Sequence, residues 1–135
     1  MVRSILVVLF ALALGGCVLA AGAGQPRPAE PPEAVARAFV TALGGWDEPT
    51  LRRLLIPTAT TEILLAAEGS AWRGWVRDPL GPQTSVEITD VIVAPPRATV
   101  VARSRHQAGE AGVRLALVQA EDGAWRVESW HSYRP

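Results

Sequence analysis

Few side chains in this 135-residue chain are suited to acid–base chemistry, because it has only two histidines and one tyrosine. His131 and Tyr133 continue the every-second-residue series that begins with Trp125 and Val127, and Asp90 lies in the same kind of series with Val86, Ile88 and Ile92. Because the apolar face of a strand packs toward the core, we expect all three on the inner side of a sheet. A carboxylate, an imidazole and a phenol on one concave surface are capable of general acid–base catalysis. The other polar residues expected on that side are Ser104, His106 and Gln119.

A structural explanation competes with the catalytic one. His131 and Tyr133 lie close to the C-terminus, where strands fray and side chains are often solvated. The sequence also holds no H-x-x-x-H motif, no glycine-rich phosphate loop and no G-x-S-x-G elbow, so we expect no metal and no cofactor. We therefore expect no catalytic residue, with Asp90, His131 and Tyr133 as the candidates if the chain is an enzyme.

A tryptophan- and arginine-rich segment follows the middle of the chain. Trp72, Arg73, Trp75 and Arg77 lie within six residues of one another. Tryptophan and arginine are common anchors of interfaces, so this segment is a candidate binding lip for a ligand or a partner. The alternative is that both tryptophans fill the open end of the core, and the sequence leaves both interpretations open.

The apolar spacing changes along the chain from helical to strand-like. Apolar residues at helical spacing predict helices at Glu33–Leu43, Glu48–Leu55 and Glu62–Glu68. Gly69 is expected to end the third helix, and Ser70–Gln83 is expected to form a loop.

Alternating apolar residues then predict four strands, which short turns separate. Short links favour antiparallel neighbours, and helices followed by strands indicate an α+β fold with helices on one face of the sheet. The strands contain Val86–Ile92, Ala98–Ala102, Val113–Leu117 and Trp125–Val127. The turns are Pro95–Pro96, Gln107–Gly112 and Glu121–Gly123.

The N-terminus has the pattern of an export signal. Arg3 precedes the apolar run Ile5–Leu14, and small residues follow. Leu14-Gly15-Gly16-Cys17 resembles the lipobox of bacterial lipoproteins, which implies cleavage before Cys17 and lipidation of its thiol. Cleavage without lipid near Ala20–Ala23 and an uncleaved anchor over Ile5–Gly24 remain alternatives. We expect a signal peptide at 1–16, a lipidated cysteine with a proline-rich tether at 17–32 and one domain at 33–135.

Two stretches of the domain resemble the nuclear-transport-factor-2-like superfamily of cone-shaped α+β domains. One is Ala36–Asp47 leading into Leu51–Leu55, and the other is Asp122–His131, which ends in an Asp-Gly-x-Trp-Arg-Val pattern. The resemblance covers about residues 33–133 and implies N-terminal helices packed on a curved antiparallel sheet. In cone enzymes of this superfamily an inward Asp or His is a general base and a Tyr or Asp polarises a carbonyl, roles that Asp90, His131 and Tyr133 would take.

The function we expect is that of an exported, lipid-anchored protein with a non-catalytic cone domain that binds a ligand or a protein in the bacterial cell envelope. One alternative is a small cone-pocket enzyme of the isomerase, dehydratase or cyclase kind. Another is an accessory subunit of a conjugation or secretion apparatus with an uncleaved anchor. The 13 basic and 13 acidic residues balance, which argues against a nucleic-acid partner. Expected partners are the membrane through Cys17, an envelope protein, a small apolar ligand, or a second copy contacting Trp130, Val101 and Val118.

Overall fold

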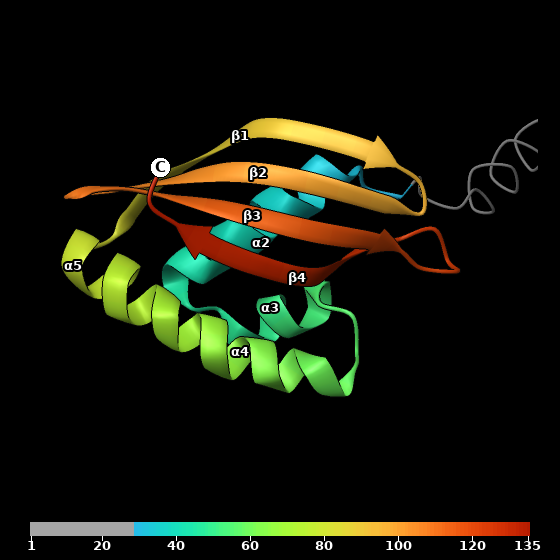
Figure 1. The fold of residues 1–135 in the computed structure, drawn as a ribbon, viewed down its shortest axis with the longest axis horizontal. Coiled ribbons are helices and arrows are strands. Elements are labelled where there is room, and N and C mark those ends of the chain that lie inside the picture. The colour runs from blue at the N-terminus through green and yellow to red at the C-terminus, as the bar shows by residue number, and fades with distance from the viewer. Residues whose placement is uncertain (1–28) are drawn as a thin grey trace, which may run out of the picture.

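The structure is a computed structural model that describes residues 29–135, and the predicted signal peptide, Cys17 and most of the tether lie outside the described residues. Helices form one layer and a curved antiparallel sheet forms the other (Figure 1). The helical elements are α2 (Pro32–Gly45), α3 (Glu48–Leu54), α4 (Ala59–Ala71), the π-helical η1 (Trp72–Arg77) and α5 (Asp78–Leu80). The strands are β1 (Gln83–Ala94), β2 (Arg97–His106), β3 (Gly109–Gln119) and β4 (Trp125–Tyr133).

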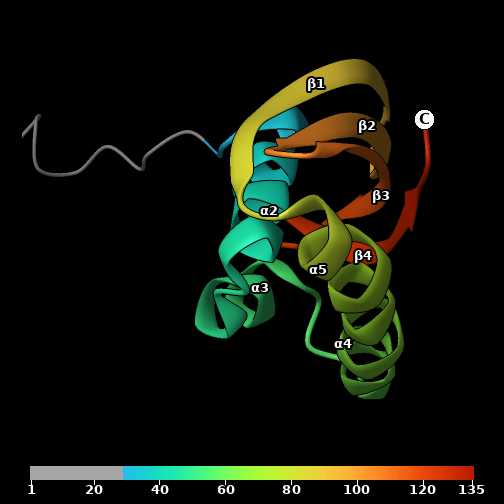
Figure 2. The ribbon, with the colours of Figure 1, turned by 90° about the vertical axis from the view of Figure 1, so that its left-hand side faces the viewer.

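The four strands pair in the order β1-β2-β3-β4, each antiparallel to the next. The sheet curves around α2, which contacts all four strands from the concave side (Figure 2). The predicted α+β class and its four-stranded meander are therefore confirmed. Between α3 and α4, Leu55 forms a single parallel bridge with Val127 instead of a strand.

The predicted loop at Ser70–Gln83 is wrong, because the helix continues past Gly69 to Leu80. In η1 the backbone widens, and the N–H of Asp78 donates to the carbonyl of Arg73 five residues earlier. In a regular α-helix the ring of Pro79 would clash with the carbonyl of Trp75. The wider turn lies directly before Pro79. The helical segment therefore continues to Leu80, although a proline in a helix interior usually ends the helix. No helix among residues 29–135 is long and apolar enough to cross a bilayer.

The register of β1 shifts first between Gln83 and Ser85, and two further β-bulges, one in β1 and one in β4, reverse the faces of the residues that follow them. In β1, Ile88 pairs with Ala102 and Asp90 with Val101, so Thr89 is an extra residue. In β4, Val127 and Ser129 pair with adjacent residues of β3, so Glu128 is also extra. An extra residue moves every following side chain to the opposite face.

The core lies between α2 and the concave face. Trp130, predicted on the outer face as part of a dimer interface, is instead 2% exposed and packs edge-on against Phe39 at 5.7 Å between ring centroids. That prediction is wrong because the bulge at Glu128 turns Trp130 inward, so Val101 and Val118 remain on the outer face without it. The largest fully buried side chains include Trp72, Phe39, Leu43, Leu51, Leu55, Leu115 and Leu117.

Trp46 connects α2 to α4. It ends α2 in the left-handed conformation, with φ of 49°, which is rare for a bulky residue. A Cβ placed on Gly69 would lie 2.4 Å from the far edge of the Trp46 ring, so Gly69 provides the space into which this ring fits. The guanidinium of Arg73, four residues after Gly69, lies 4.9 Å from the centroid of the same ring, a cation–π contact.

This contact predicts opposite effects for two glycine substitutions in the same helical segment. Gly69→Ala forces the Trp46 ring to move and lowers the free energy of unfolding by about 1–3 kcal/mol, the usual range for overpacking. Gly74→Ala, whose Cβ would meet nothing within 4 Å, raises it by up to about 1 kcal/mol. Urea denaturation of both variants measures the difference, and equal effects would contradict the Trp46–Gly69 contact.

Candidate functional site

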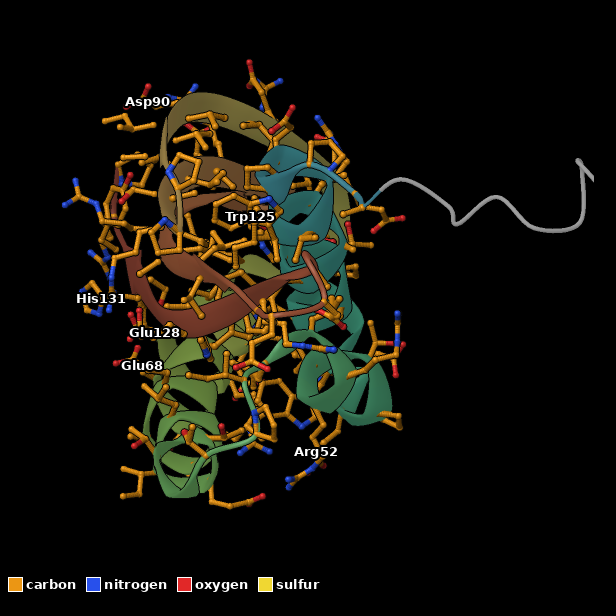
Figure 3. The ribbon with its side chains drawn as sticks, turned by 90° about the vertical axis from the view of Figure 1, so that its right-hand side faces the viewer. Arg52, Glu68, Asp90, Trp125, Glu128 and His131 are labelled. Carbon is orange, nitrogen blue, oxygen red and sulfur yellow. The ribbon has the colours of Figure 1, made fainter. Side chains whose placement is uncertain are left out.

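The predicted inward placement of Asp90, His131 and Tyr133 is wrong. Asp90 and His131 lie on the outer, convex side of the sheet, whereas Trp125 points into the space between the sheet and α2 (Figure 3). The reason is the bulges at Thr89 and Glu128, which precede these residues and reverse their faces. The sequence alternation predicted the wrong side because it assumed uninterrupted strands.

The outer face also keeps these residues apart. Asp90 pairs with Val101, Val101 with Arg114, and Arg114 with His131. The carboxylate and the imidazole are therefore carried by the two edge strands, at opposite ends of one line of paired residues across the sheet. Three strand spacings separate them by roughly 14 Å, beyond hydrogen-bond reach. The side chain of His131 is 71% exposed, and its Nδ1 lies 3.6 Å from Glu68 Oε2.

Tyr133 packs on a glycine instead of facing a cavity. It pairs with Gly112 on β3, and a Cβ on Gly112 would lie 2.4 Å from the tyrosine ring. The ring therefore covers the glycine backbone, an arrangement that stabilises a strand where no side chain fills the space. Asp90, His131 and Tyr133 thus form no common site.

The polar residues that do face inward form a continuous hydrogen-bond chain. Gln83 Nε2 donates to Ser104 Oγ at 2.8 Å and to the carbonyl of Val40 at 3.0 Å. Ser104 Oγ lies 2.8 Å from His106 Nε2, and His106 Nδ1 lies 2.9 Å from the carbonyl oxygen of Gly81. The carbonyl requires Nδ1 to carry a proton, so in the neutral ring Nε2 accepts from the serine hydroxyl. The inward placement predicted for Ser104 and His106 is confirmed.

A serine beside a histidine is the arrangement of an activated nucleophile, but this pair is closed to a substrate. Ser104 is fully buried and His106 is 7% exposed. The ring of Trp72 lies 5.7 Å from that of His106 and covers the same end of the sheet. The chain instead joins α2, the turn at Gly81 and β2. Gln83 was not predicted as a member because its position was assigned to a loop.

Aromatic and aliphatic side chains fill the space between the helices and the concave face of the sheet. Trp72, Phe39 and Trp130 are all 2% exposed or less. Within residues 29–135, three buried side-chain polar atoms have no protein partner, namely Trp72 Nε1, Trp130 Nε1 and Ser132 Oγ. Gln119, also predicted to be inward, bonds the carbonyl of Gly123 in its own turn.

The four residues of the predicted lip divide between different environments. Trp72 belongs to the core, as the second interpretation had it, and Arg73 stacks on Trp46. Trp75 and Arg77 line separate surface pockets on either side of α5. One has a volume of about 340 Å³ and is lined by Trp75, Pro79, Leu80, Gly109, Glu110, Arg134 and Pro135. The other has a volume of about 490 Å³ and is lined by Gly44, Gly45, Arg77, Asp78, Gly81, Pro82 and Gln83.

The strongest charge cluster lies at the surface, away from both pockets. Arg52 bonds Glu48 at 2.8 Å and also bonds Glu62 on α4. The hydrogen bond from Arg52 lowers the pKa of the Glu62 carboxyl, and the bonds to Glu62 and Glu48 raise the pKa of Arg52. The cluster links α3 to α4. Because its groups are exposed, it adds little to the free energy of unfolding. Within residues 29–135, no three His, Cys, Asp or Glu side chains come together as a metal site.

Comparison with known proteins identifies the fold. No protein family matches the sequence, and no curated protein does. Among solved structures, one from Campylobacter jejuni, described provisionally as an NTF2-like transpeptidase, is 12% identical with a TM-score of 0.59, covering 73% of this chain and 98% of its own. An NTF2-like protein of unknown function from Silicibacter pomeroyi is 18% identical, with a TM-score of 0.52 and coverages of 75% and 90%.

A third structure, from Shewanella frigidimarina and described provisionally as a ketosteroid isomerase, is 15% identical with a TM-score of 0.51 and coverages of 74% and 92%. Together with the helices packed on a curved four-stranded sheet, these similarities show that the chain has the nuclear-transport-factor-2-like cone fold. At these identities the similarity extends to the fold alone, and this fold carries many unrelated functions.

The bulge in β4 predicts a sharp contrast between neighbouring residues. Trp130→Ala removes a buried ring that packs on Phe39 and lowers the free energy of unfolding by about 3–5 kcal/mol. His131→Ala changes it by about 0.5 kcal/mol or less, because that side chain is mostly solvated. Urea titrations followed by circular dichroism measure both. A larger loss for His131→Ala than for Trp130→Ala would place the histidine inside.

The buried hydrogen-bond chain predicts a cost for removing one hydroxyl. Ser104→Ala leaves His106 Nε2 without its donor in a buried site and lowers the free energy of unfolding by about 1–3 kcal/mol. Ser85→Ala, at an exposed position of β1, is the matched control and has little effect. Thermal and urea unfolding of the two variants provide the measurement. Equal free energies of unfolding would show that the buried hydrogen-bond chain does not stabilise the domain.

Proposed function

We propose that this protein is an exported bacterial lipoprotein, anchored through Cys17, whose cone domain is a non-catalytic binding module in the cell envelope. The observation that carries the proposal is the closed interior: Trp72 and Trp130 occupy the concave side, and the inward Ser104 and His106 are buried and engaged with each other. A cone without an open cavity favours recognition at its surface over catalysis within it.

The anchoring half of the proposal rests on the sequence. An apolar run ends in Leu14-Gly15-Gly16-Cys17, and a proline-rich segment follows before α2 begins at Pro32. Prolines favour extended backbone, which suits a spacer between a membrane and a domain. Two acyl chains suffice for stable attachment, whereas one chain is marginal. The membrane is therefore the first partner that we propose.

The binding surface that we propose lies at the end of the molecule where η1 and α5 lie. Trp75 is half-buried and Arg77 is exposed, and each lines a surface pocket there. In the pocket that Trp75 lines, apolar side chains lie with Arg134, and an apolar wall with a guanidinium suits a protein segment or a small apolar ligand with an acidic group. We propose this end, and not the cone interior, as the surface that meets an envelope partner. A second copy could meet the outer face at Val101 and Val118, where Trp130 takes no part.

Intact-mass analysis of the full chain from bacterial membranes tests the anchor. The expected mass is that of residues 17–135 with a diacylglyceryl group on Cys17, with or without a further acyl chain. Cys17→Ser is the control and should lose the lipid mass and leave the membrane fraction. A chain that retains Met1 would replace the lipoprotein proposal with an uncleaved anchor, the arrangement of the accessory-subunit alternative. A cleaved chain without lipid would indicate secretion instead.

A further inference from the structure

We propose that the tip of the β1–β2 hairpin is a second, shallow membrane contact, which docks on the lipid surface that holds the acylated N-terminus. The tip comprises Ile92–Pro96, at the end of β1 and in the turn before β2. This inference rests on the proposed lipid anchor, because the tip by itself presents too little apolar surface to bind a bilayer firmly. Its occupant is a lipid surface, and other occupants are outcomes of the test below.

The tip is the most apolar exposed segment in the part of the chain that the structure describes. Ile92 is 61% exposed and Val93 is 47% exposed, and the only other large apolar side chain of comparable exposure there is Ile63 on α4. Ala94, Pro95 and Pro96 are exposed as well, and no charge interrupts the run. Isolated exposed apolar residues are ordinary, but five adjacent ones at a projecting turn indicate a surface that meets another apolar phase.

The bulge in β1 is what exposes Ile92. Without Thr89 as an extra residue, Ile92 would share the inner face with Val86 and Ile88. With the bulge, Val91 takes the inward position and Ile92 pairs with Thr99 on the outer face. The structure thus places a β-branched apolar side chain outside, where folding of the domain gains little from it.

The position of the tether selects the lipid surface as the occupant. The tip and the first described residues, which lead into α2, lie at the same end of the molecule, and the β2–β3 turn lies at the opposite end (Figure 1). The twelve residues from Cys17 to Pro28 span about 40 Å at most when fully extended. A chain of this length keeps that end near the bilayer, and tethering makes a weak contact intramolecular with an effective concentration in the millimolar range.

Charges near the tip define how it would approach. Arg97 follows the tip, and 67% of its side chain is exposed although it pairs with Glu128. A guanidinium at this position lies at the depth of lipid phosphates when the apolar tip is inserted. The acidic turn at Glu121 and Asp122 lies at the same end of the sheet, so the contact must be made on the β1 side, with that turn in water.

Site-directed spin labelling of the full, acylated chain tests the inference. Once Cys17 carries lipid, Val93→Cys supplies the single free thiol, and Ala108→Cys in the β2–β3 turn is the matched control at the opposite end. Both proteins are reconstituted into phosphatidylcholine–phosphatidylethanolamine vesicles. We expect the label at position 93 to collide with oxygen several-fold more than with a water-soluble nickel complex, relative to the label at position 108. Adding Ile92→Ser should reduce this difference.

Each outcome supports or overturns a defined statement. Equal accessibility at positions 93 and 108, or an unchanged value after Ile92→Ser, would overturn the hairpin contact. Dipolar broadening between labels at position 93 would overturn it in favour of a contact between two copies. Intact mass of the same samples reports the lipid on Cys17 separately. An acylated protein with a solvated tip therefore refutes only the hairpin contact, whereas an unacylated protein refutes the proposed anchor.

Discussion

The faces of the residues predicted to form a site depend on two of the extra residues in the outer strands of this sheet. Thr89 in β1 and Glu128 in β4 have no partner in the pairing register, and each reverses the faces of the residues that follow it. A bulge also bends its strand and increases the local twist, and both bulges lie in strands at the edges of a curved sheet. The reversal at Glu128 places Trp130 against Phe39 at the centre of the core. The same reversals place Asp90 and His131 in solvent.

A closed interior follows from this packing. Trp130 enters from β4 and Trp72 enters from η1, and both are buried in the core between the helices and the concave face of the sheet. The inward polar residues are satisfied mainly by one another, since Gln83, Ser104 and His106 form one chain that ends on the carbonyl of Gly81. Such a chain ties the helical layer to the sheet, and a buried group left without its partner is costly. The concave side of the sheet is therefore filled by side chains of the described domain.

The two ends of the molecule differ in chemistry. One end carries the entry of the chain and the apolar hairpin tip at Ile92–Pro96, and the other carries η1, α5 and the pockets that Trp75 and Arg77 line. A domain tethered at the first end presents the second end to the surroundings. In the function that we propose, attachment and recognition would therefore use opposite ends of the domain and would not compete.

The sequence by itself determined the class of the fold, the helix at Glu33–Leu43, the four strands and the inward faces of β2 and β3, including Ser104 and His106. It succeeded there because helical and strand periodicities are local properties of the chain and these two central strands are uninterrupted. Only the tertiary structure decided the faces of Asp90, Trp130 and His131, and the helix from Ser70 to Leu80. The position of a bulge depends on the register with a partner strand. The helix α4 continues past Gly69 into η1 because Trp72 is buried in the core and Trp46 packs on that glycine. Both depend on contacts between distant residues, which local periodicity does not contain.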